Sequence, residues 1–195
     1  MSGYDERRDQ LLQAAARVFA EGGYDRTSMR DLSRASRMSL AGMYYYVKGK
    51  EDLLFQIQKS CFERVYAGGQ AAVAREAQPE HRLEAFIRHH VTFFVGHMNE
   101  MKVLAHEAES LRGELLDEIR RLKRQYVNLL LELLAALDGQ GGDPVQRHVA
   151  AYTLFGMMNW IYTWYRPGGA VGVDELATLI TRLFLNGYQV EVSAR

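Results

Sequence analysis

The stretch TSMRDLSRASRMSLAGMYYYVKGKEDL, residues 27–53, decides the fold of this 195-residue chain. Its apolar spacing and polar punctuation predict two short helices, at about 29–36 and 40–46, with a tight turn at Arg37–Met38 between them. A longer helix is expected to start at Lys50. Two short helices with a buried inner face and a basic outer face are typical of a helix-turn-helix, whose second helix enters the major groove of DNA. The sequence therefore predicts a DNA-binding protein.

Side chains at both helix starts support these boundaries. Ser28 and Asp31 have the three-residue spacing of a capping box, and Ser39 can cap the second helix. Three consecutive tyrosines, residues 44–46, lie on that second helix. The basic residues that border it are Arg34, Arg37, Lys48 and Lys50.

The longer segment LLQAAARVFAEGGYDRTSMRDLSRASRMSLAGMYYYVKGKEDLL, residues 11–54, resembles the DNA-binding domain of the TetR family of bacterial transcriptional regulators. The family pattern has a first helix that ends in phenylalanine, two residues and glycine, followed by a glycine-aromatic turn. The matching residues are Phe19, Gly22, Tyr24, Leu32, Ser33, Ala35, Met38, Ser39, Ala41, Met43, Tyr44, Tyr45, Tyr46, Val47, Gly49, Lys50, Glu51 and Leu53. The resemblance implies an all-α fold, with a helix-turn-helix DNA-binding domain at 1–50 and an effector-binding and dimerisation domain at 51–195.

Two positions depart from the family pattern. Arg37 stands where the turn usually has glycine; a non-glycine residue is tolerable there if its backbone stays at negative φ, and an arginine could reach a phosphate. Gly42 lies inside the recognition helix, where glycine costs roughly 1 kcal/mol relative to alanine and removes a side chain that could read a base. The operator sequence therefore cannot be transferred from relatives.

The resemblance also implies a set of DNA contacts. Tyr44 and Tyr45 occupy positions that contact phosphates or thymine methyl groups, and Lys50 is expected to meet a phosphate at the start of the next helix. Leu40 and Gly42 are expected to be exposed but to read little. The remaining candidate phosphate contacts are Ser28, Arg30, Arg37, Ser39 and Lys48, while Met43 and Val47 are expected to face inward.

Composition is consistent with such a protein. Formal net charge is +0, but residues 1–50 hold nine Lys or Arg and six Asp or Glu, which leaves the rest of the chain at −3. A single cysteine, Cys61, fits a reducing compartment, and the absence of a secretory signal or a 20-residue apolar run predicts a cytoplasmic protein without a membrane partner. No phosphate-binding loop, GxSxG or HExxH motif occurs, so the chain is not expected to be an enzyme or to need a cofactor.

The rest of the chain reads as further helices. Prolines and glycine clusters mark their ends, and no segment shows convincing strand alternation. The expected ranges are 50–67 (or on to 76), 80–98, 100–110, 113–137, 144–165 and 173–190. The resemblance implies that an effector shifts the first of these helices and so changes the spacing of two recognition helices that read half-sites roughly 34–36 Å apart.

The last two helices are the expected dimer interface. The helix at 144–165 is apolar or aromatic nearly all round, and the one at 173–190 has a broad apolar face at Leu176, Leu179, Ile180, Leu183, Phe184 and Tyr188. The resemblance implies that they pair with their symmetry mates as a four-helix bundle and form a homodimer. The alternative is that both helices simply form the core of a monomer.

A ligand pocket is expected around the helix at 80–98. His90 and His97 fall on its apolar face, either as polar anchors in a pocket or as core histidines bonded to backbone or water; a metal site lacks a clear third ligand. The candidate ligand-binding residues are Phe62, Phe86, His90, Phe93, Phe94, His97, Met101, Arg120, Arg124, Tyr126, Phe155, Met158 and Trp164.

A second resemblance bears on the ligand. Residues 159–188 look like the C-terminal region of TetR-type repressors of lipid and sterol catabolism that respond to acyl-CoA thioesters, through the order Trp160, Trp164, Tyr165, Pro167, Gly168, Asp174 and Glu175. The resemblance implies a small lipophilic effector, an acyl-CoA. Its phosphates would need cations, which Arg120, Arg121, Lys123, Arg124 and Arg166 can supply, unless the first four only form a solvated helix face.

Two rival functions stay open. A multidrug-sensing repressor of lipophilic cations would use a buried carboxylate such as Glu107 or Glu109. An architectural DNA-binding dimer without an effector would leave the aromatic C-terminal half without a role.

Overall fold

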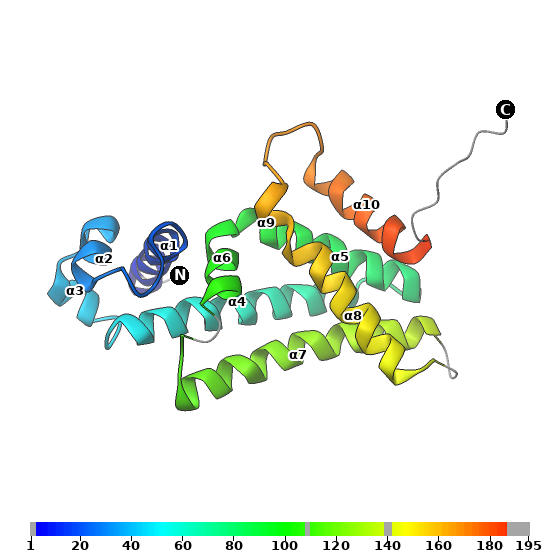
Figure 1. Cartoon of the computed structure of the whole chain (residues 1–195), viewed down its shortest axis with the longest axis horizontal. Helices are drawn as coiled ribbons and strands as arrows, with labels where there is room; N and C mark the ends of the chain where they lie inside the picture. The colour runs from blue at the N-terminus through cyan, green and yellow to red at the C-terminus, as the bar shows by residue number, and fades with distance from the viewer. Residues whose placement is uncertain (1–2, 108–109, 139–141, 187–195) are drawn as a thin grey trace. The chain divides into compact units, whose positions relative to one another are not determined.

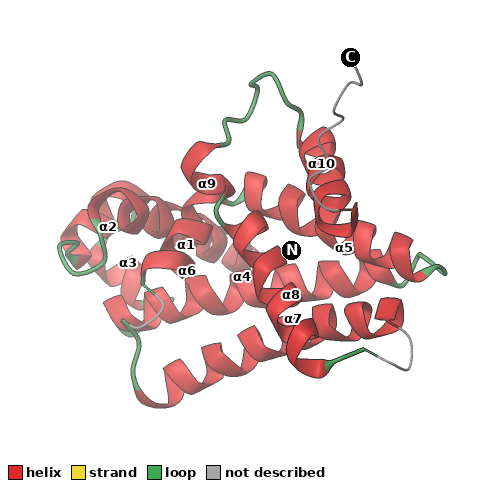
Figure 2. Cartoon of the chain, turned by 45° about the vertical axis from the view of Figure 1, so that its right-hand side comes forward, coloured by secondary structure: helices red, strands yellow, loops and turns green. Residues whose placement is uncertain are grey.

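The structure is a computed structural model that describes residues 3–107, 110–138 and 142–186, and this part of the chain is helical without strands (Figures 1 and 2). The helices are α1 (Gly3–Gly22), α2 (Met29–Ser36), α3 (Leu40–Tyr44), α4 (Lys50–Val73), α5 (Pro79–Gly96), α6 (Met98–His106), α7 (Gly113–Asp138), α8 (Pro144–Asn159), α9 (Ile161–Trp164) and α10 (Val173–Asn186). The all-α fold predicted from the sequence is confirmed. None of these described helices is long and apolar enough to cross a lipid bilayer.

Packing divides the chain into two compact units, and the long helices α4 and α7 contribute to both. The first unit comprises residues 1–64 and 97–125, and the second comprises residues 65–96 and 126–195. The helix-turn-helix thus belongs to a unit that also contains α6 and the first half of α7. The functional boundary at residue 50 stays a prediction.

The core of the first unit forms around α1. Leu11, Leu12, Ala15 and Phe19 recur at helical spacing and are buried, as the sequence predicts. They share one apolar cluster with side chains from the elements packed around them, namely Leu32, Met43, Val47, Leu53, Leu54, Ile57, Val103, Leu111, Ile119 and Leu122. Burying its inner residues in this cluster gives the five-residue α3 a fixed place that its length alone could not provide.

The second unit is built on α5, which packs against α8 and α10. Its apolar face buries Leu83, Phe86, Ile87, Val91 and Phe94. On the other side of this contact, α10 buries Leu176, Ala177 and Ile180, and Arg88 Nη1 lies 3.0 Å from Asp174 Oδ1. Two buried polar residues lie in the described part of this unit, Thr181, whose hydroxyl donates to the Ala177 carbonyl at 2.9 Å, and His90, described below.

One expected helix is broken into two. Residues 144–165 were expected to be continuous, but α8 ends at Asn159 and the four-residue α9 follows Trp160. At the break, Trp160 has φ −82° and ψ −5°, and its carbonyl accepts hydrogen bonds from the Thr163 hydroxyl at 2.7 Å and the Thr163 amide at 3.1 Å. A threonine hydroxyl that competes for a backbone carbonyl can redirect a helix, and apolar spacing does not reveal this.

Candidate DNA-binding surface and effector site

Local hydrogen bonds fix the start of each short helix. Ser28 and Asp31 form the predicted capping box: the Asp31 amide donates to Ser28 Oγ at 3.3 Å and the Ser28 amide donates to Asp31 Oδ2 at 2.9 Å. The bonds from Ser28 lower the pKa of the Asp31 carboxyl. At α3, Ser39 Oγ accepts from the Gly42 amide at 3.0 Å, as expected for a cap. The two helices therefore begin where the sequence places them.

The turn between them departs from expectation at Arg37. Its φ is +55°, in the left-handed region, and it is the non-glycine residue with positive φ in the described chain. The turn closes with hydrogen bonds from the Arg37 amide to the Arg34 carbonyl at 3.3 Å and from the Met38 amide to the Ser33 carbonyl at 3.2 Å. This closure uses the left-handed conformation that glycine adopts freely, so the condition of a negative φ is not met and Arg37 occupies a backbone region that favours glycine.

Tyrosines dominate the outer face of α3. Tyr44 and Tyr45 are 54% and 72% exposed, while Met43 and Val47 are buried as predicted. The helix ends at Tyr44, two residues earlier than expected, because the Tyr46 and Val47 amides both turn back to the Met43 carbonyl. Leu40 is exposed, whereas Gly42 is half-buried rather than exposed.

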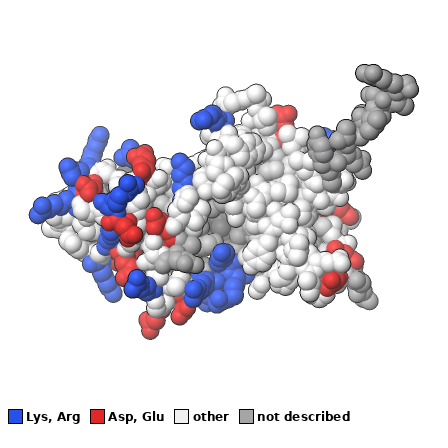
Figure 3. All heavy atoms as spheres, viewed as in Figure 1, with Lys and Arg blue, Asp and Glu red and all other residues white. Residues whose placement is uncertain are grey.

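Cations surround these tyrosines in the first unit. Arg30, Arg34, Arg37 and Lys48 are exposed, as are the capping residues Ser28 and Ser39. Figure 3 shows Lys and Arg side chains over the α1 to α3 end of this unit, with Asp and Glu among them. One acidic neighbour is Asp31, whose carboxylate pairs with Arg34. The arrangement suits contact with a phosphate backbone by several side chains at once.

Lys50 is held inward. Its ammonium donates to the carbonyls of Tyr24 at 2.9 Å and Asp25 at 3.4 Å, and it lies 4.2 Å from the centre of the Tyr24 ring. The side chain thus ties the start of α4 to the loop between α1 and α2. A phosphate contact remains a prediction for this residue, and the structure adds a stabilising role.

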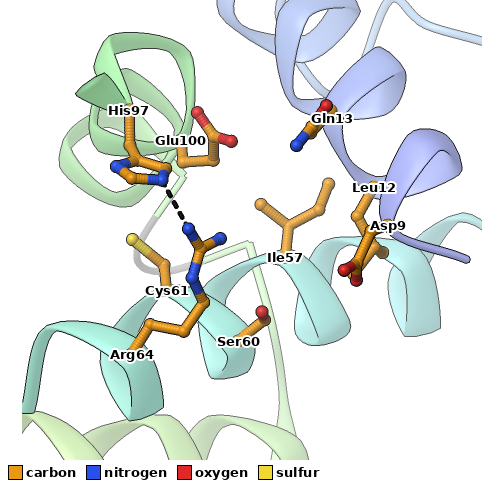
Figure 4. Close-up of a pocket in the computed structure, with 9 residues that line it drawn as sticks. All are labelled: Asp9, Leu12, Gln13, Ile57, Ser60, Cys61, Arg64, His97 and Glu100. Carbon is orange, nitrogen blue, oxygen red and sulfur yellow. Dashed lines mark hydrogen bonds between the residues drawn. The ribbon is translucent and has the colours of Figure 1, made fainter. Parts of the chain in front are cut away.

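A small cavity lies within the first unit between α1, α4 and α6 (Figure 4). It has a volume of about 20 Å³, room for about one water molecule. Arg64 donates to Nε2 of His97 at 2.6 Å, since a guanidinium can only donate. Cys61 lies beside them with its sulfur 3.6 Å from the sulfur of Met101, and burial raises the pKa of its thiol to about 12. His97 therefore lines this cavity, and Met101 contacts Cys61, which also lines it.

The second unit holds a buried aromatic cluster around His90, formed by Phe86, Phe94, Tyr126 and Phe155 together with His90, and Met158 is also buried in this unit. The ring of His90 stacks on Phe94 at 4.5 Å and on Tyr126 at 5.7 Å between centroids. Its Nδ1 lies 2.9 Å from the Tyr126 hydroxyl and its Nε2 lies 3.1 Å from Oδ1 of Asn159. An amide oxygen accepts, so Nε2 carries the proton and Nδ1 accepts from tyrosine.

This environment keeps His90 neutral. Burial is the main cause that lowers its pKa to about 3, partly opposed by the bond to Asn159. These surroundings are those of a hydrogen-bonded core histidine. A polar pair among apolar rings is also what a ligand-binding site uses to orient its ligand, so both roles of His90 stay open.

The other candidate ligand residues are not among the members of that cluster. Phe62 packs against the core of the first unit, and Phe93 is half-buried in the second. Arg120 and Arg124 are exposed on α7, with Arg120 3.7 Å from Asp117. Trp164 is 56% exposed. The structure brings together five of the predicted residues, and it assigns His90 to the second unit and His97 to the first, since α5 ends at Gly96 and does not carry both.

Sequence reasoning missed some residues that shape these sites. Asn159 completes the polar contact of His90, and no spacing in the sequence pointed to it. Gly68 is a second such residue, since glycine inside a helix usually has a packing reason. A Cβ at Gly68 would lie 2.3 Å from Cε1 of His89, so glycine permits the ring to approach α4 and contact the Val65 carbonyl at 3.1 Å.

Two family models match the chain. Residues 11–57 match the description "Bacterial regulatory proteins, tetR family", and residues 76–188 match "Tetracyclin repressor-like, C-terminal domain". The second match alone spans more than half of the chain. The two matched regions carry the helix-turn-helix and the His90 cluster, respectively.

Similar proteins agree with these matches. The chain is 25% identical over 190 residues to the HTH-type transcriptional repressor KstR2 of Rhodococcus jostii, covering 95% of this chain and 93% of that protein. It is 22% identical over 181 residues to the fatty acid metabolism regulator protein of Bacillus subtilis, covering 91% and 93%. It also resembles the crystal structure of AibR in complex with isovaleryl coenzyme A and operator DNA, with a TM-score of 0.78, 32% identity and coverage of 91% and 97%. The chain belongs to the TetR family of bacterial DNA-binding transcriptional regulators, which are not enzymes.

Proposed function

We propose that this protein is a repressor that binds operator DNA as a homodimer in the bacterial cytoplasm and releases it when an acyl-CoA thioester binds. The observation that carries the proposal is the likeness to AibR, a relative 32% identical over nearly its whole length whose structure holds isovaleryl-CoA and operator DNA. The relatives also include a fatty acid metabolism regulator protein, whose name is compatible with an effector from lipid metabolism.

The DNA-binding part of the proposal rests on α3 and its neighbours. In a helix-turn-helix, the second helix enters the major groove and the flanking residues contact phosphates. Here the exposed rings of Tyr44 and Tyr45 would lie at the groove, with Arg30, Arg37 and Lys48 at the backbone. Ser28, Ser39, Leu40, Gly42 and Lys50 complete the proposed surface.

The homodimer part of the proposal rests on apolar surface that the chain itself leaves exposed. On α8, the exposed residues Val145, Val149 and Tyr152 follow at helical spacing, on a side other than the one that buries Leu154 and Met158. In Figure 3 the surface over α8 is almost free of charged side chains. Contiguous exposed apolar residues of this kind mark association surfaces.

The final helix repeats the pattern. Leu179 and Leu183 on α10 are one turn apart and about 40% exposed, while Leu176 and Ile180 pack into the chain. Tyr188 lies outside the described residues. We place the homodimer contact on these outer faces of α8 and α10, with each helix meeting its symmetry mate.

Sedimentation velocity tests the interface. The double substitution Val149→Glu with Leu183→Glu puts charge on both faces and should convert a dimer into a monomer. Leu185→Glu, a similarly exposed leucine on another side of α10, is the matched control and should leave the dimer intact. A double variant that sediments as wild type would place the interface elsewhere.

The effector part of the proposal rests on the aromatic cluster of the second unit. An acyl chain needs an apolar chamber, and Phe86, Phe94, Phe155 and Met158 supply one around the polar pair His90 and Tyr126. A thioester carbonyl would replace His90 Nδ1 as the acceptor of the single proton on the Tyr126 hydroxyl. Phe62, Phe93, His97, Met101 and Trp164 stay candidate contacts, and Arg120 and Arg124 stay candidates for the CoA phosphates.

Isothermal titration with isovaleryl-CoA and with longer acyl-CoAs tests this part directly. Binding of a thioester, but not of free CoA or the free acid, supports the proposal. The variant Tyr126→Phe should weaken binding while keeping the rings packed. Absence of binding across short, medium and long chains would remove the acyl-CoA assignment.

The structure gives little support to a sensor of lipophilic cations. Glu107 was a candidate carboxylate for such a ligand, but its Oε1 accepts from the Tyr24 amide at 3.1 Å and its Oε2 accepts from the Ser110 hydroxyl at 2.8 Å. The carboxylate thus holds together two segments of the first unit. Glu109, the other candidate, lies outside the described residues.

A further inference from the structure

The first turn of α1 contacts the two residues that directly follow the recognition helix α3. Centroid to centroid, the Tyr4 ring lies 4.9 Å from the Tyr46 ring and 5.8 Å from the Tyr45 ring, and the rings of Tyr45 and Tyr46 are 5.1 Å apart. All three separations fall within the roughly 4.5–7 Å range of attractive aromatic pairs. We call Tyr4, Tyr45 and Tyr46 the tyrosine cluster.

A second attachment lies one helical turn farther along α1. Arg8 Nε donates to Gln56 Oε1 at 2.9 Å, and Nε2 of the same glutamine donates to the Tyr46 carbonyl at 3.2 Å. Arg8 is half-buried, unlike its exposed neighbours on this turn. The N-terminal two turns of α1 therefore hold the end of α3 through both a ring contact and a backbone carbonyl.

The cluster has a consequence for Tyr45, which remains 72% exposed although one edge of its ring is held. An unrestrained surface side chain loses rotamer freedom when it is immobilised against a partner, and this loss weakens binding. A ring already held in place by a neighbour loses less. We infer that Tyr4 is a positioning residue that orients Tyr45 for contact with operator DNA.

This inference rests on the proposed DNA-binding role of α3, and it assigns a function to a segment outside the matched family region. Residue 4 precedes the region matched by the family model, which starts at residue 11. The rival account is that the Tyr4 hydroxyl, on a side chain that is itself 44% exposed, binds a phosphate directly. The two accounts differ in whether the hydroxyl and Tyr45 are needed.

Binding measurements by fluorescence anisotropy separate these accounts. The probe is a labelled duplex that the wild-type protein selects from a random-sequence pool. Tyr4→Ala should weaken binding about 3- to 10-fold through loss of the ring contacts, and Tyr4→Phe should bind as wild type. In a Tyr45→Ala background, adding Tyr4→Ala should have no further effect.

Tyr44 provides a matched control, because no described ring contact joins it to Tyr4 and it is exposed on the same helix. In a Tyr44→Ala background, Tyr4→Ala should keep its full effect. Thermal unfolding of each variant shows whether the first unit remains folded, and the salt dependence should be unchanged because tyrosine neutralises no phosphate.

The outcomes are distinct. Equal losses from Tyr4→Ala with and without Tyr45, or a loss from Tyr4→Phe, would overturn the positioning role in favour of direct contact. Selective wild-type binding that Tyr4→Ala leaves intact would overturn the positioning role alone. A wild-type protein that selects no sequence would instead overturn the proposed function, and the positioning role with it.

Discussion

Substituting Gly68 by alanine tests the packing of the second unit most sharply. Gly68 lies inside α4, where alanine would ordinarily gain about 1 kcal/mol of helix stability. Here a Cβ would lie 2.3 Å from Cε1 and 2.8 Å from Nε2 of His89, closer than real Cβ atoms approach. The imidazole would therefore have to leave its place against the helix.

The cost can be worked out from that displacement. Moving the ring breaks the contact between His89 Nε2 and the Val65 carbonyl at 3.1 Å, worth about 1 kcal/mol. Forcing an added methyl group into a packed site costs about 1–3 kcal/mol more. After the gain in helix propensity, Gly68→Ala should lower the unfolding free energy by about 1–3 kcal/mol, and the Tm by about 2–4 °C for each kcal/mol.

Denaturant and thermal unfolding at one fixed protein concentration provide the assay, since dimerisation makes stability depend on concentration. Gly69→Ala is the matched control: its Cβ would meet Tyr126 at 3.4 Å, an ordinary contact, so this variant should be neutral or slightly stabilising. When His89 is first changed to alanine, Gly68→Ala should also become stabilising. A Gly68→Ala protein as stable as wild type would refute the close approach of His89 to α4.

Further outcomes follow from other parts of the structure. The folded-state pKa of His90, about 3, lies below the ordinary 6.5, so the unfolded chain takes up the proton first. Stability should be complete above pH 6.5 and fall by about 1.4 kcal/mol per pH unit below it, and His90→Gln should remove about one proton from that slope in pH-dependent unfolding. Arg37→Gly should raise the unfolding free energy by about 0.5–1 kcal/mol by relieving the left-handed backbone, yet weaken operator binding; unchanged stability would argue against strain at that turn. Lys50→Ala should weaken binding similarly on all sequences and flatten the salt slope by about one unit, and it should also lower stability by about 1 kcal/mol through loss of the Tyr24 contacts; a sequence-selective loss would mean that Lys50 reads bases.

The helix-turn-helix could be predicted because its signals are local. The bonds of Ser28 with Asp31 and of Ser39 with Gly42 join residues three apart, so their spacing is visible in the sequence. The backbone of Arg37 could not be predicted in the same way. Its left-handed φ follows from two hydrogen bonds that close the turn, and residue type alone favours the opposite sign.

The effector site was less predictable because periodicity identifies a face without its neighbours. His90 and His97 are seven positions apart, about two helical turns, and this spacing predicts that both lie on one face of a helix. The end of α5 at Gly96 gives them different partners, Tyr126 for His90 and Arg64 for His97. Only the folded chain shows which distant residue each one meets.

The exposed faces of α8 and α10 also could not be predicted from the apolar pattern alone. Apolar residues all round α8 indicated burial on more than one side, and the structure shows which of them the chain itself covers. The sequence alone could not show that Leu154 is buried while Val149 is exposed. Exposed Trp160 and Trp164 follow from the break between α8 and α9, which the apolar pattern conceals.

The most direct test of the central claim is a mobility-shift measurement on the DNA upstream of the protein's own coding sequence, with and without acyl-CoA thioesters. Isovaleryl-CoA and a long-chain acyl-CoA serve as the probes, with free CoA and the free acids as controls. The account predicts a shifted band that a thioester releases and that the controls leave in place. A selective band that no thioester changes would contradict the proposed effector, and the absence of any selective band would contradict DNA recognition by α3.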